Sequence, residues 1–300
     1  IPCVVAQRMR RRPHAQYIED HPFIVDFPVG TDEAAFGMPA HRHEGRARRD
    51  PGPFDRTIEL FGQIADTRFV GIDRVVVTQG NAHQADNANL IACLAEMGPL
   101  ARGVAVIDEG TSEAELTRLH EAGIRGARIM DLPGGAVGLS KLEAVDKKVA
   151  AMGWALAVQF DGTHILDHVE RLSRLESRYI IDHHGKFFGG VSVNGPEIAA
   201  VKTLIDRGNA FFKFAGCYES SRSGGPDYAD IAEISRALLA HAPERIIWGT
   251  NWPHNLAKTS EDYPDDAALL DTVLGWIEDE AVRRNVLVDN PESLFGFSES

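Results

Sequence analysis

Cysteine is scarce in this 300-residue chain, and the few cysteines are scattered. Cys3, Cys93 and Cys217 form no CxxC pair, so we expect neither a disulfide framework nor a thiolate metal site, and a reducing cytoplasm fits this usage best. Long apolar runs are also missing, since none approaches the roughly 20 residues that span a bilayer. The first dozen residues are basic but lack the apolar core of a secretory signal. The sequence therefore predicts a soluble cytoplasmic protein with no membrane partner.

Positive charge is in short supply as well. The chain carries 31 Lys and Arg against 44 Asp and Glu, which gives a formal net charge of −13. Binding to a phosphate backbone needs clustered Lys and Arg, so we expect no nucleic-acid partner. An anionic small molecule would have to be held by a few buried cations. Hydrophobic residues, in contrast, make up 44% of the chain, which is enough for one large core.

From about residue 72 onward, apolar β-branched runs alternate with amphipathic segments. Apolar residues recur in the amphipathic segments at steps of three and four, which is typical of helices that pack through one face. Ser112 and Pro196 stand where two of these helices are expected to begin. The predicted strands are Arg74–Thr78, Gly103–Ile107, Gly126–Met130, Trp154–Phe160, Arg178–Asp182, Ala210–Phe214 and Arg245–Trp248. The predicted helices are Ala88–Met97, Glu113–Glu121, Ser140–Met152, His164–Leu175, Pro196–Arg207 and Tyr228–Ala240.

Near-continuously apolar strands separated by helices indicate a parallel sheet that is covered on its faces. Seven such strands and an earlier one at Phe23–Phe27 make eight, the count of a (β/α)8 barrel of about 250 residues. An open doubly wound sheet is the alternative, but no GxGxxG follows the first strand. We therefore predict one α/β domain, a distorted TIM-like barrel over residues 23–300, after an irregular N-terminal extension over residues 1–22. A further helix is expected at about Phe54–Phe69.

Polar side chains gather where the predicted strands end, which is where barrels place their chemistry. Arg128 and Lys213 lie inside strands, and a buried cation must be paired or meet an anionic ligand. Of the neighbours His183 and His184 only one is expected to point inward, because strand side chains alternate. Taken singly, several of these residues suit an ordinary loop or core, and their convergence is the signal. The candidate site residues are Gln79, Asn81, His83, Arg128, Gln159, His183, Lys213, Tyr218, Arg222, Asn251 and His254.

The same residues bear on whether a metal is bound. A hydrolytic zinc barrel needs three or more His, Asp or Glu ligands and an open position. Here the eighth strand ends in Asn251, a neutral amide, and the fifth carries Gln159 where a histidine would be wanted. We therefore expect no metal and no other cofactor. An amide cannot take a proton from water, but it can donate hydrogen bonds to an oxyanion, which favours acyl transfer to a nucleophile other than water.

Five motifs give the chain a specific resemblance, namely Val76–His83, Gly126–Gly135, Asp182–Phe188, Phe212–Ser221 and Trp248–Asn255. Over residues 71–297 it resembles the amidohydrolase superfamily, in the branch of the 2-pyrone-4,6-dicarboxylate hydrolases. The resemblance implies a distorted (β/α)8 barrel with no required metal. It also implies a sugar-lactone isomerase that converts D-galactaro-1,5-lactone to D-galactaro-1,4-lactone during galacturonate breakdown, so that the expected partner is a small aldaric acid lactone.

The resemblance also implies roles for the candidate residues. His183 is expected to take the proton from the attacking hydroxyl, and Asn251 to stabilise the tetrahedral oxyanion. Hydrolases of this branch resemble the chain but carry Asp at the position of Asn251, and this difference favours isomerisation. The remaining residues are expected to bind substrate. Arg128, Lys213 and Arg222 would hold the carboxylate, while Gln79, Asn81, His83, Gln159, Tyr218 and His254 would contact hydroxyls.

The start of the chain departs from the branch. Ile24 to Asp26 matches the beginning of a first-strand signature, but the histidine that ends it is missing, and His41 or His43 in the following loop would have to replace it. This leaves two alternatives to the isomerase. One is a lactone hydrolase of the same branch, acting on an aldarolactone, a muconolactone or a pyrone dicarboxylate. The other is a barrel that binds sugar acids without turnover. The sequence leaves the oligomeric state open.

Overall fold

The computed structural model describes residues 24–28, 72, 74–252, 254 and 264–297. Several predictions therefore lie outside the described residues and stay predictions. They concern the N-terminal extension over residues 1–22, the helix at Phe54–Phe69, and the place of His41 and His43 near the site.

Eight parallel strands form one sheet in the order of the sequence. Each strand pairs with the next, from β1 with β2 to β7 with β8, and helices follow the strands around this sheet, so the predicted distorted TIM-like fold is confirmed. The bounds of β2 and β7 are as predicted, whereas β3 begins two residues earlier. The strands are β1 (Ile24–Pro28), β2 (Arg74–Thr78), β3 (Ala101–Ala105), β4 (Ile124–Met130), β5 (Ala155–Gln159), β6 (Arg178–Ile181), β7 (Ala210–Phe214) and β8 (Ile246–Trp248).

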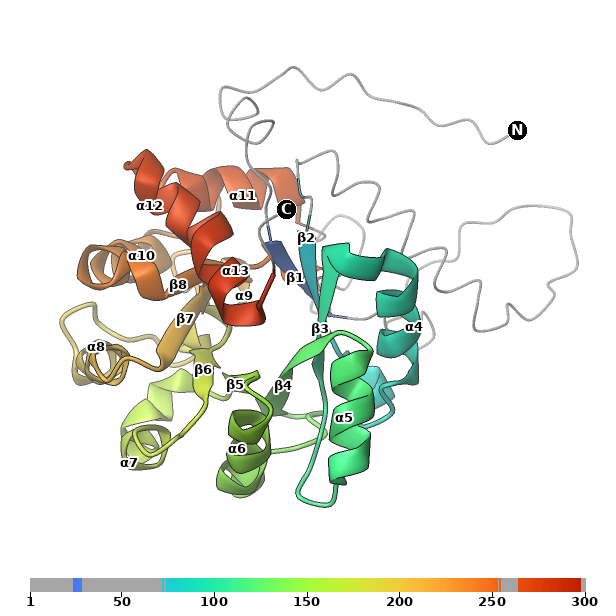
Figure 1. Cartoon of the computed structure of the whole chain (residues 1–300). Coiled ribbons are helices and arrows are strands. Elements are labelled where there is room, and N and C mark those ends of the chain that lie inside the picture. Colours follow the sequence, from blue (N-terminus) through green and yellow to red (C-terminus); the bar gives the residue numbers. More distant parts are fainter. Residues whose placement is uncertain (1–23, 29–71, 73, 253, 255–263, 298–300) are drawn as a thin grey trace, which may run out of the picture.

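Helices follow the strands and surround the sheet (Figure 1). The α-helices are α4 (Ala88–Met97), α5 (Glu113–Glu121), α6 (Leu142–Ala151), α7 (Val169–Leu172), α8 (Pro196–Asp206), α9 (Cys217–Ser220), α10 (Ala229–His241), α11 (Asp266–Leu274), α12 (Glu280–Arg284) and α13 (Asn290–Phe295). The short 3-10 segments are η1 (Asn81–His83), η2 (Gly98–Leu100), η3 (Leu139–Lys141), η4 (Gly162–Asp167), η5 (His183–Lys186) and η6 (Pro243–Arg245), and η7 (Asn285–Asp289) is a π-helix.

The helix starts show why these segments fold as they do. The hydroxyl of Ser112 accepts a hydrogen bond from the Glu115 N–H at 3.2 Å and so caps α5. Pro196 occupies the first turn of α8, where its missing N–H costs no helix bond. Both starts were predicted and are confirmed. Asp265 caps α11 in the same way as Ser112 caps α5, by accepting from the Ala268 N–H at 3.0 Å.

One predicted helix is wrong. The segment His164–Leu175 is instead the 3-10 segment η4 followed by the four-residue helix α7. The reason is a close approach of two loops, because a Cβ on Gly162 would lie 2.0 Å from the Gly185 carbonyl oxygen. The carboxylate of Asp161 also accepts from the Thr163 N–H and turns the chain there. The η4 segment thus supports η5, the loop that carries His183.

Apolar side chains form two separate clusters on the two faces of the sheet. The larger lies between the strands and the surrounding helices and includes Val75 and Val77. The smaller contains Val76 and its inward-facing counterparts on other strands, together with Leu294, Phe295 and Phe297 from α13 and the residues after it. This second cluster is the barrel interior, and α13 closes its N-terminal end. The η7 segment contacts both β1 and β8.

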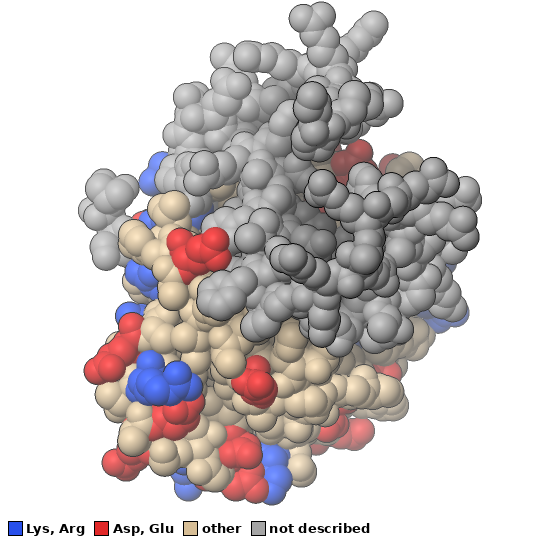
Figure 2. Space-filling model, turned by 90° about the vertical axis from the view of Figure 1, so that its right-hand side faces the viewer, with Lys and Arg blue, Asp and Glu red and all other residues tan. Residues whose placement is uncertain are grey.

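The described surface carries charges of both signs. Figure 2 shows acidic and basic side chains interspersed on one face, with no large patch of a single sign outside the grey atoms. No helix among the described residues has both the length and the apolar character to cross a membrane.

Asp146 provides a test of how the barrel is held together. Its buried carboxylate on α6 accepts hydrogen bonds from the Glu176 N–H at 2.9 Å, the Ser177 N–H at 3.1 Å and the Ser177 hydroxyl at 2.6 Å. We expect Asp146→Ala to lower the free energy of unfolding by about 2–4 kcal/mol, because these donors lose their partner at the start of β6. Urea denaturation measures the loss. Asp167→Ala removes an exposed carboxylate and should change the midpoint little; equal losses would contradict the role of Asp146.

Candidate active site

Four inward-facing polar side chains meet above the apolar barrel interior. Arg128, Gln159, Asp182 and Lys213 come from the ends of four successive strands and are at most 7% exposed. The guanidinium of Arg128 donates to the Gln159 Oε1 at 2.9 Å and to the Gln79 carbonyl oxygen at 2.8 Å. The Lys213 ammonium lies 2.6 Å from the Asp182 carboxylate. The predicted gathering of Arg128, Gln159 and Lys213 is therefore present in the fold.

Asp182 is the centre of this group, although the sequence analysis gave it no role. Its Oδ1 accepts from the His183 N–H at 2.9 Å, lies 2.9 Å from the His183 Nδ1, and contacts Lys213. Burial alone would raise the pKa of this carboxyl, but the charges of His183 and Lys213 and their hydrogen bonds together lower it. Asp182 is thus an ionised carboxylate that orients an imidazole and an ammonium.

The η5 turn directs the side chains of the two adjacent histidines to different places. Its residues all have positive φ, with values of 52° at His183, 49° at His184, 71° at Gly185 and 49° at Lys186. The ring of His184 turns into the protein, stacks on Phe214 with ring centroids 5.0 Å apart, and accepts from the Ala215 N–H. Burial lowers the pKa of His184 to about 4, so it is a neutral packing residue. His183 is left facing the site.

His183 contacts Asn251 across the barrel mouth. Its Nε2 lies 2.7 Å from the Asn251 Oδ1, and its side chain is 14% exposed. Burial lowers the pKa of His183, and Lys186 and Lys213 act in the same direction, while Asp182 opposes them. The imidazole is therefore biased toward its neutral form, which is the form that can accept a proton.

Asn251 lies at the end of β8 in a left-handed backbone conformation, with φ of 64°. Its Nδ2 donates to the Tyr218 hydroxyl at 2.8 Å. The Tyr218 hydroxyl lies 2.7 Å from the His254 Nδ1, and the His254 Nε2 lies 3.1 Å from the Asp266 Oδ1. Asn251 is thus held from both ends, and Tyr218 and His254 belong to the same hydrogen-bonded chain.

A buried ion pair borders the site. The ammonium of Lys186 contacts the carboxylate of Glu219, and both side chains are almost fully buried, with exposed fractions of 6% and 5%. Burial lowers the pKa of Lys186 to about 8, although the nearby Asp182 favours the charged form. A pair of this kind fixes two loops relative to one another, here η5 after β6 and α9 after β7.

The residues expected after β2 have structural contacts. The Gln79 amide is fully buried and donates to the Asp86 carbonyl oxygen at 2.6 Å, which holds the loop that leads into α4. The Asn81 amide donates to the Met130 sulfur, and the His83 ring lies 3.5 Å from the Asn89 amide. Gln79 shares its strand face with Val75 and Val77 of the outer cluster and points away from the barrel interior. Substrate contacts for these three residues stay predictions.

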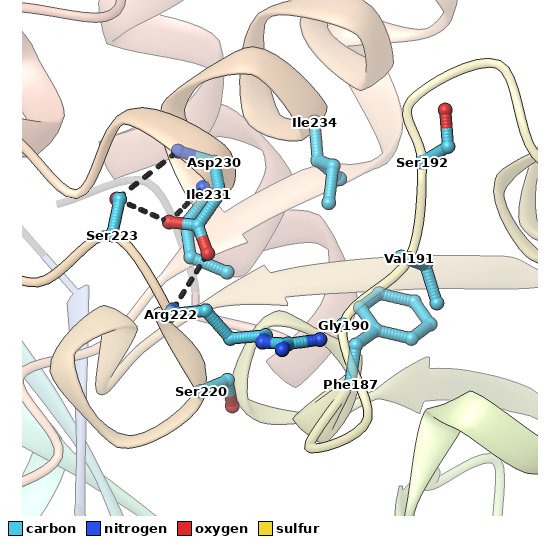
Figure 3. A pocket seen from close by; sticks show the side chains of 10 residues that line it. All are labelled: Phe187, Gly190, Val191, Ser192, Ser220, Arg222, Ser223, Asp230, Ile231 and Ile234. Carbon is cyan, nitrogen blue, oxygen red and sulfur yellow. Dashed lines mark hydrogen bonds between the residues drawn. The ribbon is translucent and has the colours of Figure 1, made fainter.

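Arg222 lines a pocket whose lining does not include His183. Its exposed guanidinium donates to the Gly189 carbonyl oxygen at 2.8 Å, and Figure 3 shows it beside Gly190 and Phe187. This pocket of about 530 Å³ lies between the loop after η5 and the start of α10. Asp230, at its edge, accepts from Ser221, Ser223 and two backbone N–H groups, and these bonds lower its pKa to about 2 against the opposing effect of burial. Arg222 is not joined to Arg128 or Lys213 by any contact among the described residues.

Sequence reasoning missed four charged residues of the site. Asp182, Lys186, Glu219 and Asp266 were not assigned roles, although the first three lie inside motifs that carried the resemblance. A carboxylate directly after a buried strand is a signal that would have found Asp182. Asp266 lies on α11, far from any strand end in the sequence, and only its contact with His254 identifies it.

The described residues offer no arrangement suited to a metal ion. No three His, Cys, Asp or Glu side chains converge among them, and His183 faces the amide of Asn251. What these residues can do is accept a proton at His183 and donate hydrogen bonds from Lys213, Arg128 and the Asn251 amide to an anionic group.

Comparison with known proteins places this geometry in context. A family model described as amidohydrolase matches residues 26–297. D-galactarolactone isomerase from Agrobacterium fabrum is 58% identical over 231 residues, which are 77% of this chain and 79% of that protein. A 2-pyrone-4,6-dicarboxylate hydrolase from Comamonas testosteroni is 29% identical over 241 residues, 75% of this chain and 77% of that protein. An apo crystal structure from Agrobacterium tumefaciens matches with a TM-score of 0.78 and 50% identity, covering 93% of this chain and 97% of that chain.

Gly216 tests how tightly Asn251 is held. A Cβ at this position would lie 2.6 Å from the Asn251 Nδ2, so we expect Gly216→Ala to push the amide out of place. Gly296 is a matched control, because its φ and ψ of 62° and 47° are close to the 58° and 45° of Gly216 and nothing lies within 4 Å of its Cβ position. Gly216→Ala should lower the free energy of unfolding by about 1–3 kcal/mol more than Gly296→Ala, measured in urea. Equal losses would mean that only backbone strain matters.

Proposed function

This chain belongs to the amidohydrolase family, and from that premise we propose that it is a sugar-lactone isomerase that converts D-galactaro-1,5-lactone to D-galactaro-1,4-lactone without a metal ion. The observation that carries the proposal is the contact of 2.7 Å between His183 and the neutral amide of Asn251, at a barrel mouth that also holds Arg128 and Lys213. The 58% identity to D-galactarolactone isomerase supports the choice of substrate. Galacturonate breakdown and a cytoplasmic location belong to the same proposal.

The reaction is an internal acyl transfer. The substrate hydroxyl on C4 attacks the C1 carbonyl carbon, so that a bond forms between O4 and C1 and the bond between C1 and O5 breaks. His183 takes the proton from O4 and returns it to O5, and no water is consumed. The tetrahedral intermediate carries a negative charge on the former carbonyl oxygen, and hydrogen bonds from the site, with Asn251 as the proposed donor, stabilise that charge.

The remaining side chains bind the substrate. Arg128 and Lys213 would hold its carboxylate, with Arg222 reached only by a larger ligand or after movement of its loop. Hydroxyl contacts are proposed for Gln159, Tyr218 and His254, which line the same mouth, and for Asn81, His83 and Gln79 at the β2 end. Lys213 is already paired with Asp182, so a bound carboxylate would share this ammonium and not replace Asp182.

A lactone hydrolase is the second candidate. It is favoured by the hydrolase relative at 29% identity. Hydrolysis, however, needs a water molecule to be held and activated beside His183, and Asn251, unlike a carboxylate, cannot act as a second base. Intramolecular attack uses the same imidazole without binding a water, and the effective concentration of a held hydroxyl reaches about 10⁵ M or more in well-oriented reactions.

Whether oxygen from water enters the product distinguishes the isomerase from the hydrolase. In water enriched in oxygen-18, we expect the 1,4-lactone product to contain no label, because O4 comes from the substrate and water does not enter. Mass spectrometry of the product, with NMR to identify the ring, measures this. The reaction is run with and without EDTA, and equal rates are expected. Labelled open acid would establish the hydrolase, and binding of the lactone without any product would establish a barrel that has lost turnover.

His183 provides the test of the mechanism. We expect His183→Ala to lower kcat by at least about 10³-fold, since the proton no longer has an acceptor, while the thermal midpoint changes little. In the wild-type enzyme kcat/KM should hold as the pH passes the ordinary pKa of histidine and fall only at lower pH, because burial lowers the pKa of His183 and protonation removes its lone pair. The control is His184→Asn, at the neighbouring histidine that packs inside the protein. Its expected effect is a loss of stability through lost packing. A His183→Ala enzyme with near-normal rates would remove this residue from the mechanism.

A further inference from the structure

The chain from His183 to Asp266 has a direction that follows from its donors and acceptors. Asp266, when ionised, only accepts hydrogen bonds, so the His254 Nε2 that lies 3.1 Å away carries a hydrogen. If His254 is neutral, its Nδ1 has no hydrogen and accepts from the Tyr218 hydroxyl at 2.7 Å. That uses the single hydrogen of Tyr218.

The direction continues to His183. Because the Tyr218 hydroxyl donates to His254, it accepts from Asn251, whose NH₂ group must then face Tyr218. The carbonyl oxygen of the Asn251 amide consequently faces His183, at 2.7 Å from Nε2. An oxygen at this place requires a hydrogen on Nε2, and the Nδ1 of the same ring lies 2.9 Å from the Asp182 carboxylate. Nδ1 makes no hydrogen bond, but the charge of Asp182 opposes the effect of burial on the pKa of His183, so this orientation of the Asn251 amide shifts the balance toward the protonated imidazole.

The opposite arrangement is equally well defined. If Asn251 turns its NH₂ group to His183, Nε2 can keep its lone pair, and the ring is neutral with its hydrogen on Nδ1, the nitrogen that lies 2.9 Å from Asp182. The Asn251 oxygen then accepts from the Tyr218 hydroxyl, and Tyr218 accepts from a hydrogen on the His254 Nδ1. With Nε2 still donating to Asp266, His254 carries the positive charge in this arrangement. One proton is therefore placed at one end of the chain or at the other.

We propose that Tyr218, His254 and Asp266 are positioning residues that determine which end of the Asn251 amide faces His183, and through it whether His183 is held protonated or neutral. The inference rests on the proposed function only in making His183 the catalytic base. It gives His254 a role distinct from hydroxyl binding and gives Asp266 a role for the first time. The charged groups that face His183 are Asp182 and Lys186 beside it and Lys213 on β7, and the acid that faces His254 among the described residues is Asp266.

Tyr218→Phe is the decisive variant, because it cuts the chain without changing any charge. With the direction lost, Asn251 is free to turn its NH₂ group to His183, so the neutral form gains and the pKa of His183 falls, by about half a pH unit or more for one hydrogen bond. NMR titration of the His183 imidazole in the absence of substrate measures this, with the resonance assigned by its absence in His183→Gln. The readout does not need turnover, so a failure of the proposed function is seen separately in the wild-type assay.

Asp266→Asn should lower the pKa of His183 in the same direction, and it should add nothing in the Tyr218→Phe background, because Asp266 acts through Tyr218. Glu278→Gln, which removes one exposed carboxylate outside the chain, controls for the change in net charge and should leave the pKa unchanged. Thermal melts check that each variant folds. An unchanged pKa of His183 in folded Tyr218→Phe would overturn the proposal, and so would a further decrease when Asp266→Asn is added to it.

Discussion

The burial of the Asp182 carboxylate is the constraint on which the candidate site depends. A carboxylate that is 3% exposed is tolerated only when cations and hydrogen-bond donors surround it. Lys213 supplies one cation, and the backbone and ring of His183 supply the other contacts. To bring both the N–H and the ring of one residue to the same oxygen, the chain must turn sharply at that residue. The left-handed η5 turn meets this requirement.

Such a turn is costly, because a positive φ costs roughly 1–2 kcal/mol at each residue that carries a Cβ. Three residues of η5 other than glycine carry it. Their side chains return stabilisation by contacts that only this backbone allows. His184 stacks on Phe214 in the outer cluster, and Lys186 reaches Glu219 on the next loop. Strain at a functional site is thus offset by the surrounding structure, as expected for a geometry that a reaction requires.

Much of the fold follows from patterns that the sequence shows directly. The bounds of α4, α5, β2 and β7 were predicted correctly, because apolar spacing and helix caps act locally. The η4 segment was not, because its shape depends on the approach of Gly162 to a loop more than twenty residues away. The helices after residue 264 were not assigned at all. For the site, strand ends located Arg128, Gln159 and Lys213, but not the partners that hold them.

The missed residues share a physical cause. Lys186 and Glu219 are 33 positions apart, and neither lies in a strand, so no periodicity indicates the direction of either side chain. The same applies to Asp266, whose contact with His254 depends on where α11 packs. Arg222, a cation beside a motif, was expected in the carboxylate site; the structure places it at the edge of a pocket whose lining does not include His183, and its role in binding stays a prediction. Residue type predicts the chemistry of a side chain well, whereas loop conformation decides which side chains lie in the same site.

The choice between moving an ester and hydrolysing it comes down to the amide at position 251. A carboxylate there would hold a water molecule and accept its proton, and would add a second negative charge close to Asp182. An amide does neither, and it leaves His183 as the proposed base at the mouth. We propose that this base serves a hydroxyl that the substrate itself carries into the mouth. A hydroxyl held beside the carbonyl reacts far faster than free water at a comparable base. Because the neutral Asn251 side chain does not activate water, it favours the internal reaction.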